Sequence, residues 1–243
     1  MADLAKYLPL SRRPAGDESG ANSNWSGHLT ATLTATADLL DGLAAEQWEA
    51  PSLCAEWRVR DVAGHIVWRL GSSSRDLVHT AARAYLGHFV NPNRAIDVVS
   101  RAAAEAAPAD LVARIRQIAA DKAAGRGRCG IIELTEAVVH GYDIARPLGL
   151  SLMLAPTASG AVALRRSLIA PTGIKAVLHG RTLVATDADW SVGRGPALPG
   201  TAEEIVLFLF NRGPLPASPP PAASPPPAAS PPPAASPPPA KPQ

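Results

Sequence analysis

Apolar residues recur at helical spacing through the first part of the chain and predict a series of helices between residues 25 and 150. The predicted helices lie at about residues 29–47, 59–70, 95–107, 108–118 and 131–145. The predicted helices are separated by segments that favour turns or terminate helices, at residues 51–57, 91–93 and 125–127. Pro147 and Gly149 follow the last helix. Several helices joined by short turns are typical of a helical bundle.

The pattern changes after residue 150. Three short segments, at residues 175–178, 181–186 and 189–192, predict strands, with turns at residues 179–180 and 187–188. A helix is expected from Thr201 to Asn211, because Thr201 can cap its first turn and Glu204 stands three residues later as the partner in a capping box. This stretch predicts a small α+β domain.

Both ends of the chain differ from the part between them. From Ser218 the sequence SPPPAA repeats, which predicts a disordered, extended polyproline II tail. A solvated tail and a ligand for a polyproline-recognising domain both remain open. The start of the chain has no apolar stretch of the kind found in signal peptides. The predicted organisation is therefore a flexible leader (1–24), a helical bundle (25–150), a small α+β domain (151–212) and a proline-rich tail (213–243).

Composition narrows the classes of partner. A chain of 243 residues, 47% of them hydrophobic, is large enough to build a core. Its 23 basic and 21 acidic residues form no basic block, which argues against nucleic acid or an anionic membrane surface. No apolar run reaches the ~18–20 residues that span a bilayer. Cys54 and Cys129 lack the spacing of a metal or redox pair, so two free thiols and a cytoplasmic location are expected.

Three residues are candidates for binding one divalent metal. Glu136 and His140 stand four residues apart on one predicted helix, so they share a face, and His65 lies on an earlier helix. Two histidines and a carboxylate that leave a fourth position open are typical of a catalytic zinc site. The same residues also fit a solvated polar face that includes Asp143, and a buried histidine without a metal. Asp61, one turn before His65, is either a partner that orients its ring or only an acid at a helix start.

Two motifs resemble one known family. Residues 48–65 (WEAPSLCAEWRVRDVAGH) and residues 136–149 (EAVVHGYDIARPLG) look like the signatures of the mycothiol-dependent maleylpyruvate isomerases. The second is similar to the family's form Glu-x-x-x-His-x-x-Asp-Ile-x-Arg-Pro-Leu-Gly. The resemblance covers roughly residues 25–212 and is weaker after Gly149.

The resemblance implies a DinB-like four-helix bundle with a metal site, followed by the small α+β domain. His65, Glu136 and His140 match the family's ligands for a divalent metal, expected to be Zn²⁺. Mycothiol would be the thiol cosubstrate, and the reaction would be thiol transfer to an electrophilic small molecule or thiol-assisted isomerisation of it. An arginine from the C-terminal domain would contact an anionic substrate, and Arg212 and then Arg194 match it. Cys54 is expected to be a packing residue.

A second class of function stays open. The chain could be a non-catalytic module that binds a metal or a partner, with the proline-rich tail as the interaction element. In that case Arg212 and Arg194 would be ordinary surface arginines near the ends of secondary-structure elements.

Overall fold

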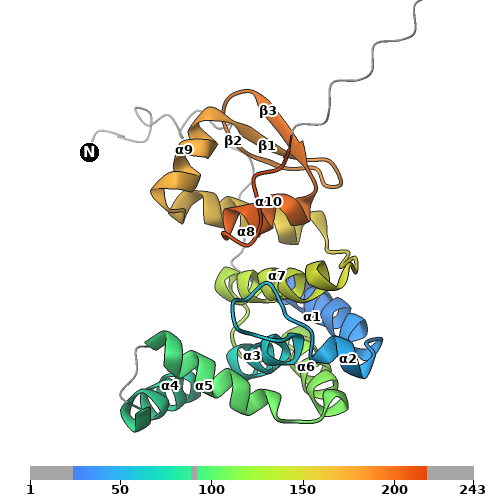
Figure 1. Cartoon of the computed structure of the whole chain (residues 1–243), viewed down its shortest axis with the longest axis vertical. Coiled ribbons are helices and arrows are strands. Elements are labelled where there is room, and N and C mark those ends of the chain that lie inside the picture. Colours follow the sequence, from blue (N-terminus) through green and yellow to red (C-terminus); the bar gives the residue numbers. More distant parts are fainter. Residues whose placement is uncertain (1–23, 89–91, 218–243) are drawn as a thin grey trace, which may run out of the picture.

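The computed structural model describes residues 24–88 and 92–217 (Figure 1). Within this part the helices are α1 (Ser26–Asp41), α2 (Ala45–Trp48), α3 (Val59–Gly71), α4 (Ser74–His88), α5 (Pro92–Ala104), α6 (Pro108–Ala123), α7 (Ile131–Ala145), α8 (Pro156–Ile169), α9 (Thr172–Gly180) and α10 (Ala202–Leu209). The predicted leader, except for Asn24, and the proline-rich repeats from Ser218 onward lie outside the described residues.

Helices α1, α3, α6 and α7 pack against one another as a bundle, which confirms the predicted fold class. Helix α5 lies against α3, and α4 packs on α5, so that this pair projects from one side of the bundle (Figure 1). Helix α4 was not predicted, and it packs mainly against α5. None of the described helices is long and apolar enough to cross a bilayer.

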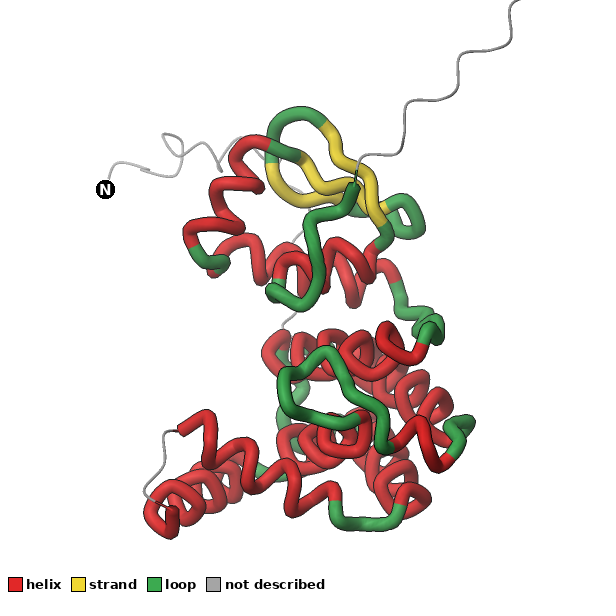
Figure 2. Tube along the Cα trace, in the orientation of Figure 1, coloured by secondary structure: helices red, strands yellow, loops and turns green. Residues whose placement is uncertain are grey.

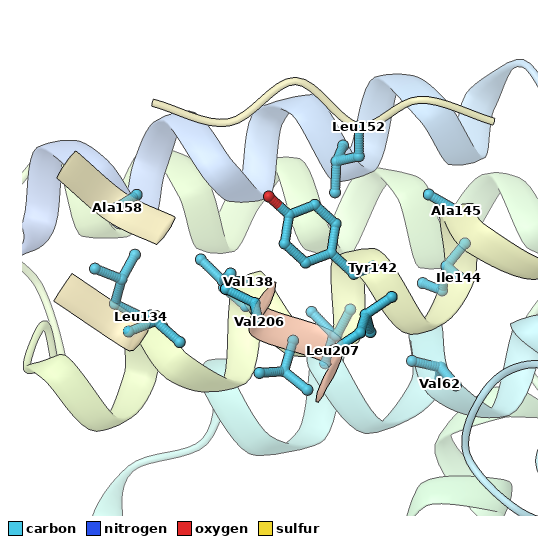
Figure 3. Packing of buried hydrophobic residues seen from close by; sticks show 14 of the residues in the cluster. Val62, Leu134, Val138, Tyr142, Ile144, Ala145, Leu152, Ala158, Val206 and Leu207 are labelled. Atoms are coloured by element: carbon cyan, nitrogen blue, oxygen red, sulfur yellow. The ribbon is translucent and has the colours of Figure 1, made fainter. Parts of the chain in front are cut away.

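Apolar side chains from both parts of the chain surround α7. Leu134, Val138 and Tyr142 on α7 are almost fully buried and pack with Val206 and Leu207 of α10 (Figure 3). On its other sides, α7 contacts α1 and α3 of the bundle. Because α7 is covered by the bundle and by the C-terminal part at once, the stripe of polar residues along it does not face open solvent.

The C-terminal part combines three helices with a three-stranded sheet of order β2-β1-β3 (Figure 2). Strand β1 (Thr182–Ala185) pairs antiparallel with β2 (Ser191–Gly193) and parallel with β3 (Ala197–Gly200). Helix α10 begins as predicted, since the Thr201 side chain accepts a hydrogen bond from the Glu204 backbone N–H at 3.2 Å. The predicted α+β character is therefore confirmed.

Three details of the C-terminal prediction were wrong. Residues 175–178 form part of α9 and not a strand, so no hairpin turn occurs at residues 179–180. Ile174 and Leu178 are both buried, and their spacing of four is helical. Helix α8 and strand β3 were missed. The buried face of α8 consists mainly of small residues, and β3 contains a proline and a glycine, so neither gives a clear apolar pattern.

One glycine sets the distance between α3 and α5. A Cβ added at Gly64 would lie 2.6 Å from the Ser100 carbonyl oxygen and 2.7 Å from the Ala104 backbone nitrogen. Neither backbone atom can move without shifting α5. We therefore expect Gly64→Ala to lower the free energy of unfolding by about 1–3 kcal/mol in urea denaturation. Gly173→Ala is the control, because a Cβ added at Gly173 meets nothing within 4 Å. This variant is expected to raise the free energy of unfolding by up to about 1 kcal/mol, because alanine favours the helix more than glycine does. Equal effects would contradict this account.

Candidate metal centre

The structure brings the three predicted metal ligands together. His65 projects from α3, and Glu136 and His140 project from adjacent turns of α7. Glu136 Oε2 lies 3.5 Å from His65 Nε2 and 3.2 Å from His140 Nε2. One ligand atom from each residue falls within 4.8 Å of the other two, and the two imidazole rings lie edge to face with centroids 4.7 Å apart. The residues therefore converge on one place.

The second ring nitrogen of each histidine is engaged by a neighbour. Ser100 Oγ donates to the Ile96 carbonyl oxygen, so its lone pairs can accept from His65 Nδ1 at 2.9 Å. Asp143 Oδ2 accepts from His140 Nδ1 at 3.0 Å. These contacts place the proton on Nδ1 of each ring and turn both Nε2 atoms toward Glu136. Partners of this kind commonly orient the histidines of metal sites.

The donor set fits a small divalent ion. Two ligand atoms of a tetrahedral zinc site at ordinary bond lengths are about 3.3 Å apart. The two distances from Glu136 Oε2, 3.2 and 3.5 Å, match this separation. Imidazole nitrogens and a carboxylate oxygen are also the usual protein ligands of zinc. Three protein ligands would leave the fourth position of a tetrahedral ion for a ligand that enters from outside.

Burial and charge act together on the three ligands. Burial alone would raise the pKa of Glu136, but its close contacts with His140 and His65 hold that pKa far below the usual range. The pKa of His65 is lowered, chiefly by burial. Arg69 Nε lies 3.5 Å from Glu136 Oε1, the oxygen that faces away from the histidines. Glu136 is thus kept as a carboxylate with Oε2 free for a metal.

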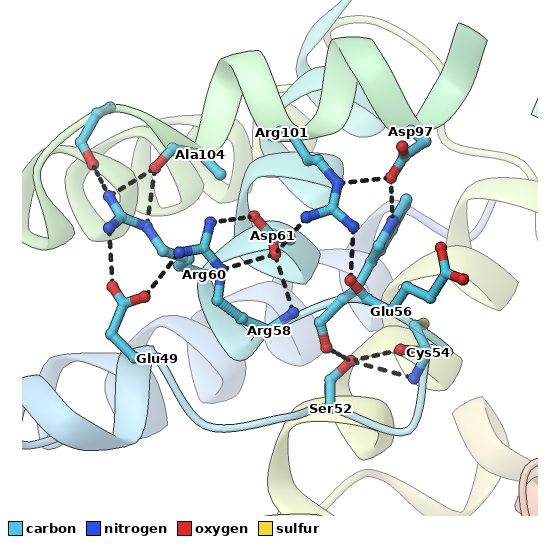
Figure 4. Close-up of polar contacts among 12 residues, drawn as sticks. Glu49, Ser52, Cys54, Glu56, Arg58, Arg60, Asp61, Asp97, Arg101 and Ala104 are labelled. Atoms are coloured by element: carbon cyan, nitrogen blue, oxygen red, sulfur yellow. Dashed lines mark hydrogen bonds and ion pairs between the residues drawn. The ribbon is translucent and has the colours of Figure 1, made fainter. Parts of the chain in front are cut away.

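Asp61 does not orient His65, contrary to one of the two interpretations of the sequence. It is fully buried and receives hydrogen bonds from the Arg58 backbone and guanidinium at 2.9 to 3.0 Å (Figure 4). Arg101 lies 3.6 Å away on the other side. The partner of His65 comes instead from α5, as Ser100. Asp61 serves to fix the start of α3.

The same ionic network ties the loop at residues 51–58 to neighbouring helices (Figure 4). Arg101 donates to the Glu56 carbonyl oxygen, and the indole of Trp57 donates to Asp97 Oδ1 at 2.7 Å. Glu56 adopts a left-handed φ of 64°, a conformation that non-glycine residues rarely take. The loop is therefore tied to α3 and α5 at several points.

Removing the Asp61 carboxylate is expected to lower the free energy of unfolding by about 2–3 kcal/mol, measured for Asp61→Ala in urea at pH 7. The loss should stay below that of a fully buried pair, because Arg58 and Arg101 are 38% and 37% exposed and can be resolvated. Burial raises the pKa of Asp61, but Arg58 outweighs it and the net pKa is lowered. The stabilisation is therefore present above the ordinary carboxyl pKa and disappears as pH falls below it.

Asp38→Ala is the matched control for Asp61→Ala. Asp38 pairs with Arg116 at 2.9 Å, but its side chain is 62% exposed. An exposed pair of this kind contributes less than about 1 kcal/mol. Similar losses for the two variants would contradict the assignment of a stabilising role to the buried carboxylate.

A cavity of about 600 Å³ opens beside His65 and His140. Its other lining residues are Cys54, Ala55, Glu56, Trp57, Arg94, Asp97 and Arg212. Arg212, one of the two arginines expected to contact a substrate, thus lines this cavity. Arg194 does not line this cavity. It is exposed beside strand β2, and its backbone N–H donates to the Leu178 carbonyl oxygen.

Cys54 is free, as is Cys129, and it is 7% exposed at the wall of the cavity. Its thiol donates to Asp143 Oδ2 at 3.1 Å, so it has a polar contact in addition to the packing role predicted for it. The residues that α5 contributes to the site were missed. Arg94, Asp97 and Ser100 follow one another at spacings of three, which places them on one helix face, and this pattern was the available signal.

Residues 29–128 match the sequence profile of the mycothiol maleylpyruvate isomerase N-terminal domain, and this range includes His65. The crystal structure of the mycothiol-dependent maleylpyruvate isomerase is 14% identical, with a TM-score of 0.49 over 86% of this chain and 92% of that one. A histidine-to-alanine mutant of that enzyme gives 13% identity and a TM-score of 0.46 over the same shares. No curated protein matches. The profile match confirms the predicted resemblance: residues 29–128 of this chain are similar to the N-terminal domain of mycothiol maleylpyruvate isomerases.

Proposed function

We propose that this protein is a zinc-dependent, mycothiol-using enzyme that transfers the thiol to an electrophilic small molecule or isomerises that molecule with its help. One observation carries the proposal. His65, Glu136 and His140 present ligand atoms within 4.8 Å of one another, and the two histidines line a cavity of about 600 Å³. The cavity is large enough for a small substrate beside the metal.

Within this proposal, residues 25–150 form the metal-binding unit and residues 151–212 supply Arg212 to the same cavity. When bound, the metal supplies positive charge at an open coordination position, which lowers the pKa of a thiol placed there. His65 and His140 hold their Nε2 atoms toward that position, and Glu136 balances the charge. The chain then needs no nucleophile of its own.

Arg212 is proposed to bind an anionic group of the substrate. Its Nε lies 3.2 Å from Asp143 Oδ1, and one terminal nitrogen lies 3.7 Å from Cys54 Sγ. These two contacts leave several of the five guanidinium N–H donors available to the cavity. Arg194, on the surface near β2, has no comparable position. It remains the less supported of the two predicted arginines.

The partners that follow are mycothiol and a small electrophile. A cytoplasmic location is part of the proposal, because both cysteines are free and mycothiol is a thiol that must stay reduced. The proline-rich repeats lie outside the described residues, and the proposal assigns them no part in the reaction.

The first test is the metal content of full-length protein purified without a histidine tag. We expect close to one zinc ion per chain. Thiol-dependent conversion, measured with mycothiol and a panel of electrophiles, should disappear when the metal is removed by a chelator and return when zinc is restored. A protein that takes up no metal would overturn the proposal. Stable metal binding without conversion of any electrophile would favour the non-catalytic module instead.

A further inference from the structure

Asp143 contacts three functional groups at once. Oδ2 accepts from His140 Nδ1 at 3.0 Å and from the Cys54 thiol at 3.1 Å. Oδ1 lies 3.2 Å from Arg212 Nε. In addition, its backbone carbonyl accepts from the Leu53 N–H at 3.1 Å, which joins α7 to the loop at residues 51–58. The carboxylate is completely buried.

These contacts have two explanations. Cys54, Asp143 and His140 Nδ1 lie close enough together to hold a second cation. However, the Arg212 guanidinium already lies at 3.2 Å from Asp143 and 3.7 Å from the Cys54 sulfur. A fixed positive charge at this distance repels a metal ion, and it supplies the counter-charge that a buried carboxylate needs. The arrangement therefore favours a carboxylate that orients its neighbours over a second metal site.

We propose that Asp143 is a positioning residue that links the metal ligand His140 to the substrate-binding arginine Arg212. One oxygen fixes the His140 ring with Nε2 toward Glu136, and the other holds Arg212, which comes from the C-terminal part of the chain, beside the same cavity. The separation between the metal and the cation is thereby set by a single side chain. This inference rests on the proposed function.

The two histidines differ in this respect. His65 is oriented by a neutral hydroxyl, Ser100, whereas His140 is oriented by a charged carboxylate. A carboxylate makes the stronger hydrogen bond and raises the basicity of the ring, so it should contribute more to metal affinity. Asp143 is consequently expected to matter more than Ser100 for holding zinc.

The test is the zinc affinity of the full-length protein, measured by competition with a chromophoric chelator. Zinc ion is the probe, and neither mycothiol nor an electrophile is added. Asp143→Asn keeps the shape of the side chain and removes its charge, and Asp143→Ala removes both contacts. We expect the dissociation constant for zinc to rise by about 10-fold to 100-fold, more in the alanine variant than in the asparagine variant. Circular dichroism checks the fold, and the asparagine variant decides the matter if the alanine variant does not fold.

Asp97→Asn is the matched control. Asp97 also lines the cavity, but its carboxylate binds Trp57 and Arg101 and no metal ligand. Its zinc affinity should stay within about threefold of the wild type, since no ligand loses its partner. Folded Asp143 variants with wild-type affinity would overturn the inference and leave the proposed function intact. A wild-type protein that binds no zinc would overturn both.

Discussion

Replacing His140 with alanine is expected to abolish stoichiometric zinc binding while the fold remains. His140 supplies one of three ligands, and its Nε2 lies 3.2 Å from the Glu136 oxygen that would share the ion. Loss of a ligand should weaken zinc by more than the roughly 100-fold that loss of an orienting partner causes. Zinc content after gel filtration, measured by atomic emission, and circular dichroism of the same samples test this expectation.

His179→Ala is the control for His140→Ala. His179 is exposed on α9, and its ring nitrogen contacts only the Lys175 carbonyl oxygen among the interactions of the described residues, at 2.6 Å. Its removal should leave the zinc content unchanged. Retention of zinc by His140→Ala, or equal losses in both variants, would mean that the ion binds elsewhere.

Replacing Arg212 with methionine is expected to lower kcat/KM for thiol-dependent conversion by about 100-fold to 1000-fold, with zinc content unchanged. The reason is electrostatic. Arg212 lines the cavity beside His140 and keeps donors available for a substrate anion, which gains more from a fixed positive charge in a partly buried site than in water. Steady-state rates with the best electrophile from the panel provide the measurement.

Arg194→Met is the control for Arg212→Met, because Arg194 is exposed and does not line the cavity. It should keep the wild-type rate. Because Arg212 also pairs with the buried Asp143, the unfolding of Arg212→Met must be compared with that of the wild type. A folded Arg212→Met variant with the wild-type rate would contradict a role for Arg212 in substrate binding. A large loss of kcat/KM in Arg194→Met would indicate that Arg194 has that role.

Local sequence patterns predicted the helices that carry the three candidate metal ligands. The limits of α7 agree with the prediction, because Gly127 precedes it and Pro147 and Gly149 follow it closely. The two ligands on α7 share a face at a spacing of four, and this spacing is local as well. Patterns of this kind depend on neighbouring residues and are therefore readable without the tertiary fold.

Contacts between distant elements were not predictable in this way. Asp61 stands one turn from His65, but it accepts a hydrogen bond from the nearby Arg58. The hydrogen-bond partner of His65 is instead Ser100, 35 residues away. Asp143 fitted a solvated polar stripe, yet it is completely buried, and Arg212, which lies 3.2 Å from it, comes from beyond α10. Spacing along the chain does not show with which of several polar neighbours a side chain forms a hydrogen bond or an ion pair.

In the proposed function, a metal held by His65, Glu136 and His140 would lower the pKa of the mycothiol thiol and ionise it. We would test this step by measuring proton release when mycothiol is mixed with zinc-loaded protein in weakly buffered solution at pH 7. Zinc-free protein and His140→Ala are the controls. We expect release of about one proton per site from the zinc-loaded protein and none from the controls. No release from protein that demonstrably contains one zinc ion per chain would contradict it.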